Sequence, residues 1–209
     1  SLMNDLGYEV GTLGNHEFDF GQKILRARIN DATFPIICAN INSSRGELDS
    51  IPPYYIIEKD GIKLGFISFV QTETDQIPST NPERLKDITF DHYLDKVEDY
   101  KPLKRQCDVL IGLTHLGVDK DSILATQMPE LDIITHTLLE TSKEINNVII
   151  GQTGLKLQYA GLTILKFTKG KLTERSYQSC LIDTITRVDS CIARKVNYFM
   201  EQPEFKEVI

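Results

Sequence analysis

The stretch GTLGNHEFDFG, residues 11–21, decides the fold, because here an apolar run ends in a cluster of polar side chains between two glycines. The overlapping run YEVGTL predicts a short strand, and the residues after this cluster predict a helix. Asn15, His16 and Asp19 therefore fall at the carboxyl end of a strand. Ligands of α/β proteins bind at this edge, where loops converge over the strand ends. The stretch is either a polar turn or part of a reactive site.

Two other predicted strands also end in histidine. His115 closes the buried run CDVLIGLTH, and His136 follows LDIIT. A further strand, FPIICAN, ends at Asn40. Three of the four histidines thus fall at strand ends, which is not expected of four histidines scattered over 209 residues. The remaining histidine, His92, is predicted to be a solvated residue on the polar face of a helix.

Each of these residues also has a purely structural interpretation. A histidine after a strand is more often a loop residue than a ligand. Asn15 beside Gly14 could be a turn residue, and Asp19 could be the N-cap of the following helix. We favour a shared site, because the polar residues recur at the same edge on separate strands.

The composition is that of a globular protein and excludes some partners. A chain of 209 residues is long enough for one domain with a sizeable core. Its net charge of −7 argues against a general binder of nucleic-acid polymers, which needs a basic face. No apolar run approaches the roughly 20 residues of a membrane span. The four cysteines are spaced too widely for a zinc cluster and are expected to be buried thiols.

The apolar pattern alternates strands with helices and contains two hairpins. Asp60-Gly61 and Lys169-Gly170 are expected at the two hairpin turns, because each pair stands between β-rich arms. Residues 71–89 show no period and predict a long loop, whereas residues 186–202 predict a terminal helix. This order indicates an α/β fold with a mixed sheet.

The side chains at the shared edge suit a divalent metal site. Histidine nitrogens, an asparagine amide oxygen and neighbouring carboxylates favour a metal such as Zn, Mn, Fe or Co. Two such ions can share a hydroxide and clamp a phosphate for in-line attack. His16 would then lie near the leaving group, and Asp19 would orient its imidazole.

The same residues resemble a known family. The stretch GTLGNHEFDFG is similar to the signature G-N-H-E-[FL]-D of the calcineurin-like metallophosphoesterases, in the form used by the 5′-nucleotidase family. DVLIGLTHLGVDKD, LDIITHTLLE and VIIGQTGLKLQYAGLTILKF resemble later segments of that family, so the resemblance covers most of residues 2–182. It implies a four-layer α/β/β/α sandwich with mixed sheets, its N-terminal part missing, and residues 1–185 as the catalytic domain.

The resemblance also implies a role for each matching residue. Asn15 and His115 would ligate one metal of a pair of divalent ions, and His136 would ligate the other. His16 and Asp19 would form the catalytic dyad, with His16 acting at the phosphate and Asp19 holding it. The implied reaction is hydrolysis of a nucleotide phosphoester, either a nucleoside 5′-phosphate or a 2′,3′-cyclic phosphate, by a hydroxide that bridges two metals.

Two departures from the family pattern bear on the site. The motifs D-x-H and G-D, which supply the bridging carboxylate in the family, have no counterpart in this chain. The pattern G-G-H-[ST]-H-T is reduced to THT, as though three residues were missing between Ile134 and Thr135. We favour omitted segments, which predicts a break between these two residues; the alternative is a fragment or a degenerate relative. As it stands, the chain is expected to hold at most one weakly bound metal and to be inactive.

The remaining expectations concern substrates and partners. Residues 186–209 are expected to connect to a C-terminal domain, fused or on a separate chain, that recognises the nucleobase. The family implies a periplasmic, secreted or surface location. The alternatives are hydrolysis of a nucleotide sugar or another phosphoester, or a non-catalytic relative that binds a nucleotide or a protein partner. A plain α/β domain without a site is the remaining structural interpretation.

Overall fold

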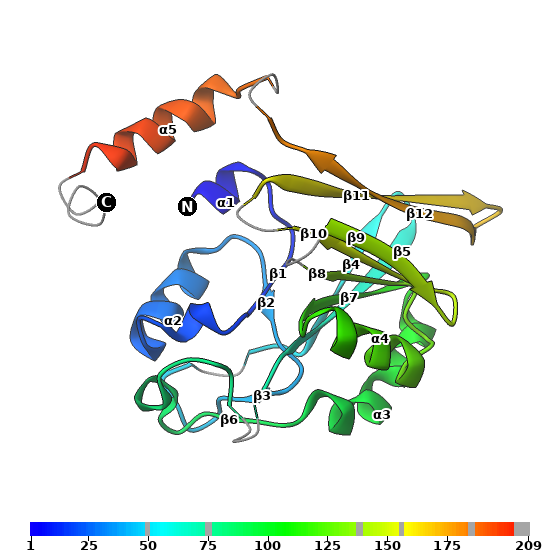
Figure 1. The fold of residues 1–209 in the computed structure, drawn as a ribbon, viewed down its shortest axis with the longest axis horizontal. Helices are drawn as coiled ribbons and strands as arrows, with labels where there is room; N and C mark the ends of the chain where they lie inside the picture. Colours follow the sequence, from blue (N-terminus) through cyan, green and yellow to red (C-terminus); the bar gives the residue numbers. More distant parts are fainter. Residues whose placement is uncertain (49–50, 74–76, 137–139, 155–156, 184–186, 203–209) are drawn as a thin grey trace.

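A mixed six-stranded sheet lies at the centre of the molecule, in the order β4-β5-β7-β8-β10-β9 (Figure 1). The structure is a computed structural model that describes residues 1–48, 51–73, 77–136, 140–154, 157–183 and 187–202. The α/β fold with a mixed sheet is confirmed. The strands of the sheet are Tyr54–Lys59 (β4), Ile62–Val70 (β5), Val109–His115 (β7), Ile133–His136 (β8), Val148–Thr153 (β10) and Glu140–Ile145 (β9).

Six further strands form three two-stranded sheets, and short helices join the strands. The pairs are Gly11–Thr12 (β1) with Ile36–Ile37 (β2), Ile41–Asn42 (β3) with Thr89–Phe90 (β6), and Tyr159–Thr168 (β11) with Lys171–Leu181 (β12). The α-helices are Leu2–Asp5 (α1), Gln22–Asp31 (α2), Val97–Tyr100 (α3), Val118–Gln127 (α4) and Ser190–Met200 (α5). The 3-10 turns are His16–Phe18 (η1), Pro82–Leu85 (η2), Tyr93–Lys96 (η3) and Lys101–Gln106 (η4).

The elements stack in four layers. The sheet residue Ile134 packs with Val97 of α3, Leu103 of η4 and Leu124 of α4 in one core on the first face of the six-stranded sheet. The β11–β12 hairpin lies against β10 on the other face, where a side chain at Gly151 would meet the Tyr177 ring at 2.5 Å. Strand β1 contacts β7, and Leu25 and Ile29 of α2 share a core with Ile36 of β2. Helices thus lie on both sides of the β elements, in line with the α/β/β/α order that the family resemblance implies.

Both hairpins turn where the sequence predicts. Asp60 and Gly61 adopt φ values of 51° and 78°, and Lys169 and Gly170 adopt 52° and 75°. Two successive residues with positive φ give the type I′ turn that matches the twist of the flanking strands. Strand β9 was not predicted, since its sequence ETSKEI carries little apolar signal; it forms an edge of the sheet by pairing with β10.

The chain is continuous where a break was predicted. Ile134 and Thr135 are consecutive residues of β8, and they pair with the consecutive residues Ile150 and Gly151 of β10. The ladder runs unbroken through both residues, so the predicted break is not present, while the omission of family residues from the sequence stays a prediction. His136 follows in the same ladder, opposite Gln152.

The expectation for the cysteines was only partly right. Cys38 is buried, but Cys180 and Cys191 are exposed on β12 and α5, and all four thiols are free. No helix among the described residues is long and apolar enough to cross a membrane. Helix α5 packs on α1 with an ion pair of 2.6 Å between Lys195 and Asp5. Its role as a connector stays a prediction, and the proposed boundary at residues 185–186 lies outside the described residues.

Candidate functional site

His16 and Asp19 form a hydrogen-bonded pair on the surface. The His16 Nδ1–H donates to Asp19 Oδ2 at 2.8 Å, and their side chains are 79% and 42% exposed. The Thr80 hydroxyl donates to the other carboxylate oxygen at 3.0 Å. The hydrogen bond from His16, and after it the one from Thr80, holds the pKa of Asp19 below its usual value. Asp19 is thus a carboxylate oriented toward the imidazole.

The local fold excludes the N-cap interpretation of Asp19. Helix α2 begins at Gln22 with Gly21 as its N-cap, and Gly21 adopts a φ of 82° that favours glycine. Asp19 instead ends the η1 turn, which is anchored by the completely buried Phe18. This anchor leaves the two polar side chains on either side of Phe18 in solvent.

Asn15 and His115 lie together at the neighbouring strand ends. The His115 Nε2–H donates to Asn15 Oδ1 at 3.0 Å, and the Asn15 amide nitrogen donates to the Ser79 carbonyl at 2.9 Å. The bond to Ser79 fixes the amide so that its oxygen faces the histidine. Gly14 permits this approach, because a Cβ there would lie 3.0 Å from both His115 Nδ1 and Glu17 Oε2.

His136 completes the group beneath this contact. Its ring centroid lies 5.3 Å from that of His115, and its side chain is buried. The His136 Nδ1–H donates to the Thr114 carbonyl at 2.6 Å, which leaves Nε2 as the free ring nitrogen. Burial is the main cause that lowers the pKa of both histidines, with the neighbouring His136 lowering that of His115 further. Both imidazoles are therefore neutral at physiological pH, as metal ligands must be.

These donor atoms fit one divalent ion. Asn15 Oδ1 and His115 Nε2, the two atoms that the sequence predicts as ligands, point at each other. His136 has the arrangement of a ligating histidine, with one ring nitrogen bound to a backbone carbonyl and the other free. Within the described ranges, no group of three or more His, Cys, Asp or Glu residues could hold a metal. The described residues thus provide no bridging carboxylate for a second ion.

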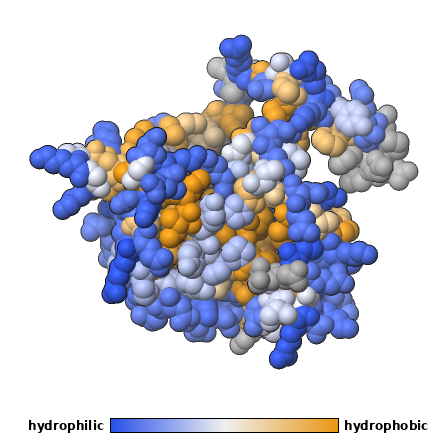
Figure 2. Space-filling model, turned by 180° about the vertical axis from the view of Figure 1, so that it is seen from behind, coloured by the Kyte–Doolittle hydropathy of each residue, from blue (hydrophilic) through white to orange (hydrophobic). Residues whose placement is uncertain are grey.

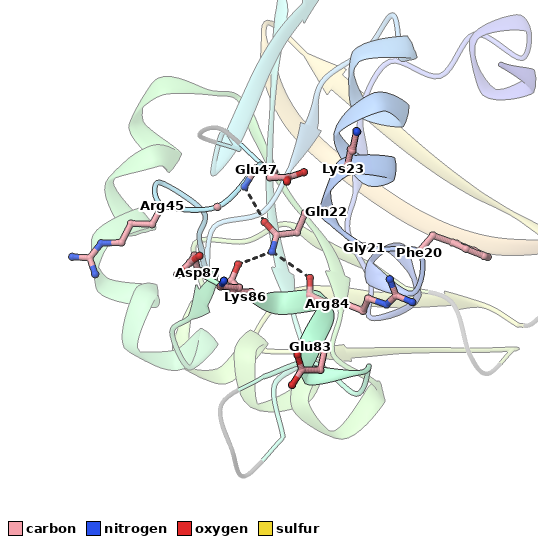
Figure 3. A pocket seen from close by; sticks show the side chains of 11 residues that line it. Phe20, Gly21, Gln22, Lys23, Arg45, Glu47, Glu83, Arg84, Lys86 and Asp87 are labelled. Atoms are coloured by element: carbon pink, nitrogen blue, oxygen red, sulfur yellow. Dashed lines mark hydrogen bonds between the residues drawn. The ribbon is translucent and has the colours of Figure 1, made fainter.

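A polar hollow of about 510 Å³ lies at the start of α2 (Figure 3). Gln22 occupies its centre, accepting from the Glu47 N–H and donating to the carbonyls of Arg84 and Lys86. Figure 3 shows that the side chains of Lys23, Arg45 and Arg84 point in different directions. Their charges do not converge on one point, so the hollow does not have the geometry of a phosphate site.

An apolar groove of about 690 Å³ reaches the dyad residue His16. Its lining includes Tyr8, Leu13, Phe34 and Leu113, with His16 at its margin. Apolar side chains gather in the middle of the molecule on the face seen in Figure 2. Of the two hollows, the apolar groove is therefore the one whose lining includes a dyad residue.

Asn40, which was noted at a strand end, and His92 both have structural roles. Asn40 is completely buried; its amide nitrogen donates to the carbonyls of Val70 and Asp91, and its amide oxygen accepts from the Val70 N–H. Its oxygen is therefore already engaged in tying β5 to the loop beside β6. His92 is exposed, as predicted, and caps the η3 turn through a 3.4 Å hydrogen bond from the Leu94 N–H.

Sequence reasoning missed Ser79 and Thr80, which come from the segment predicted as a plain loop. It also missed Thr114 and Asp121 beneath the histidines. Nothing in the pattern of residues 71–89 marks the two loop residues. The eight-residue run from Thr114 to Asp121 was matched to a family segment, but neither Thr114 nor Asp121 was given a role. A carboxylate on the apolar side of a helical pattern was the one sequence feature that could have pointed to Asp121.

The chain is similar to nucleotide phosphoesterases of known name. It is 32% identical over 187 residues to the trifunctional nucleotide phosphoesterase protein YfkN of Bacillus subtilis, which covers 82% of the chain and 12% of that protein. It is 24% identical over 229 residues to a 5′-nucleotidase of Diplobatis ommata, covering 96% of the chain and 39% of that protein. The chain therefore spans well under half the length of these relatives.

Solved structures share the fold. The structure of the calcineurin-like phosphoesterase YfkN from Bacillus subtilis superposes with a TM-score of 0.80 at 22% identity, covering 99% of this chain and 73% of that one. No protein-family model matches the chain.

Proposed function

Because the chain belongs to the calcineurin-like metallophosphoesterases of the 5′-nucleotidase family, we propose that the protein hydrolyses phosphoesters of nucleotides. Its substrates would be nucleoside 5′-phosphates or 2′,3′-cyclic phosphates, and two divalent metal ions of the Zn, Mn, Fe or Co class would assist. The observation that carries the proposal is the 3.0 Å contact of Asn15 Oδ1 with His115 Nε2 beside the His16–Asp19 pair.

The dyad supplies the proton chemistry of the proposed reaction. Asp19 accepts the Nδ1–H of His16, so the other ring nitrogen faces solvent, where a phosphate group would arrive. The carboxylate orients the imidazole, and an imidazolium can donate a hydrogen bond or a proton to the leaving oxygen. Thr80 keeps Asp19 in place by binding the oxygen that His16 does not use.

Asn15, His115 and His136 are the residues that would hold metal. A bound divalent ion would act as a Lewis acid on the phosphoryl group. Asn15 contributes a neutral oxygen and the histidines contribute neutral nitrogens, so these three ligands leave the positive charge of an ion intact for the substrate. The net charge of −7 makes such local positive charge necessary for an anionic substrate.

The proposal is tested on the protein as its gene encodes it. Phosphate release from 5′-AMP, 2′,3′-cyclic AMP and a nucleotide sugar is measured with Mn²⁺. We expect His16→Ala to lower turnover by about 10²- to 10⁴-fold while Mn²⁺ affinity, measured by calorimetry, stays unchanged. His92→Ala is the matched control, because His92 is exposed and lies off the site. Unchanged turnover in the His16 variant would reject the dyad.

A non-catalytic relative that binds nucleotides is the second candidate. It is favoured by the lack, among the residues that the structure describes, of a third acidic or histidine ligand beside the pair. The 209-residue chain alone is expected to be inactive for this reason. Turnover of para-nitrophenyl phosphate by that chain with Mn²⁺ would contradict this expectation, whereas nucleotide binding without turnover in the gene-encoded protein would favour the second candidate.

The proposed organisation has two parts. Residues 1–185 would form the catalytic domain, and residues 186–209 would lead to a C-terminal domain, fused or separate, that recognises the base. A periplasmic or extracellular location is proposed from the resemblance to the family. Detection of the protein in a cytoplasmic rather than an extracytoplasmic fraction would argue against that location.

A further inference from the structure

The backbone ladder between β7 and β8 stops short of the candidate ligands. It pairs these strands only as far as Leu113 and Thr135. The ladders on the outer sides run further, with β5–β7 reaching His115 and β8–β10 reaching His136. Among the described residues, the β7–β8 register therefore does not reach either histidine. Side chains then contribute to their spacing.

Asp121 of α4 connects the strands beyond the end of that ladder. It is completely buried, and its carboxylate accepts from Thr114 Oγ1 at 2.7 Å and from Gln152 Nε2 at 3.4 Å. Thr114 directly precedes His115, and Gln152 lies opposite His136 in the β8–β10 register. One carboxylate thus holds the two strands, β7 and β10, that flank β8.

The same hydrogen bonds lead to a candidate ligand. The Thr114 hydroxyl is bound by Asp121, and the Thr114 carbonyl accepts the Nδ1–H of His136 at 2.6 Å. A carbonyl that accepts from Nδ1 selects the tautomer whose Nε2 carries the free lone pair. Movement of Thr114 would release this selection and change the distance between the two imidazoles.

A role in stability does not explain this carboxylate. Burial raises the pKa of Asp121 to about 6, although Thr114, Gln152 and the charge of Lys143 act in the opposite direction. The nearby Tyr93 has its own pKa raised, mainly by burial and then by Asp121. A carboxylate whose charged form is penalised by burial weakens the fold at neutral pH. What Asp121 contributes to the fold is therefore its pair of hydrogen bonds to the strand ends.

We propose that Asp121 is a positioning residue of the candidate metal site, which fixes the tautomer of His136 and its spacing from His115 through Thr114. The metal-binding part of this inference rests on the proposed function. The tautomer part does not, because it concerns the protein without metal.

The first readout is the tautomer of His136 in metal-free protein, measured by ¹⁵N NMR of the imidazoles near pH 7.5. We expect the Nδ1–H form in the wild type. Asp121→Leu keeps the branched shape of the side chain and removes both acceptors, so the ratio of Nδ1–H to Nε2–H should fall by at least about tenfold. Asp121→Asn keeps an acceptor for Thr114 and should retain the wild-type ratio. Asp119→Asn, on the exposed side of α4, is the control.

The second readout is Mn²⁺ affinity by calorimetry. Loss of an outer partner of a ligating histidine weakens binding by about 10- to 100-fold, so Asp121→Leu should show a fall of that size and Asp121→Asn less than about 3-fold. If Asp121→Leu does not fold, Thr114→Val removes the same hydrogen bond at nearly constant volume and should shift the tautomer in the same direction.

The two readouts separate this inference from the proposed function. Folded Asp121→Leu protein with the wild-type tautomer ratio would overturn the positioning role. A wild-type protein that binds no Mn²⁺ would count against the proposed function, while the tautomer ratio would still decide the role of Asp121.

Discussion

The two halves of the candidate site are held in opposite ways. His16 and Asp19 stand on a short turn, and their side chains are largely in solvent. His115 and His136 stand at the ends of strands in the central sheet, where burial lowers their pKa values. An exposed pair can meet a substrate and exchange protons with it, whereas buried neutral imidazoles keep their lone pairs for an ion. Position in the fold thus assigns different chemistry to the same residue type.

The largest effect should come from removing the anchor of the exposed half. Phe18 is completely buried between two exposed polar residues and makes an edge contact with Phe90 at 5.7 Å. Phe18→Ala should lower the free energy of unfolding by about 3–5 kcal/mol, measured by urea denaturation. The control is Phe20→Ala, two residues along, where the side chain is 73% exposed; a change within about 0.5 kcal/mol is expected. Equal losses in the two variants would contradict the anchoring role.

Substitutions at the strand ends that carry His115 and His136 should instead lower the affinity for metal. We expect His115→Ala to weaken Mn²⁺ binding by about 100-fold or more, since it removes a ligand and not only an outer partner. Calorimetry measures this affinity, with His92→Ala as the control that should bind as the wild type does. Binding that is unchanged in His115→Ala would show that metal, if held, is held elsewhere.

The buried carboxylate of Asp121 should make the free energy of unfolding depend on pH. The folded pKa of Asp121 lies at about 6, above its unfolded value of 3.8. Its contribution to stability is therefore full below pH 3.8 and is lost as the pH rises through 6. Relative to Asp121→Asn, the wild type should lose about 2 kcal/mol of unfolding free energy between pH 4.5 and 7.5. A difference that stays constant with pH, in paired urea titrations, would refute this.

The smallest predicted effect concerns the support of Asp19. Thr80→Val removes the hydroxyl that donates to Asp19, and the pKa of Asp19 should rise toward its ordinary value because one cause of its lowering is gone. Turnover of the gene-encoded protein should fall by roughly 2- to 10-fold, the worth of one hydrogen bond. Thr80→Ser keeps the hydroxyl and should restore both values. A carboxyl titration by ¹³C NMR that is identical in Val and Ser variants would contradict the assignment.

The parts of the fold that follow local rules could be predicted from the sequence. The Asp60-Gly61 and Lys169-Gly170 pairs specify their turns through backbone preferences alone. Strand β9 could not be predicted in this way, because its polar sequence acquires strand structure only by pairing with β10. The break expected after Ile134 rested on a family pattern, and the unbroken register of β8 contradicts it.

The candidate site shows the same division. Asn15, His16 and Asp19 lie within residues 11–21, and His115 and His136 end apolar runs, so all five were found from their position along the chain. Ser79 and Thr80 reach Asn15 and Asp19 from more than 60 residues away, and no local pattern announces such a contact. Tertiary packing alone brings them there.

Gly14 fixes the distance between the two halves. The space that a methyl group would need at this residue is already taken by His115 Nδ1 and Glu17 Oε2, each 3.0 Å from the ideal position. A larger residue would push the turn that carries the dyad away from the sheet that carries the ligands, without altering a single reactive group. The distance between the proposed catalytic dyad and the proposed metal ligands is therefore set by a residue that belongs to neither group. Tolerance to substitution at position 14 measures how far this distance can change before the site is lost.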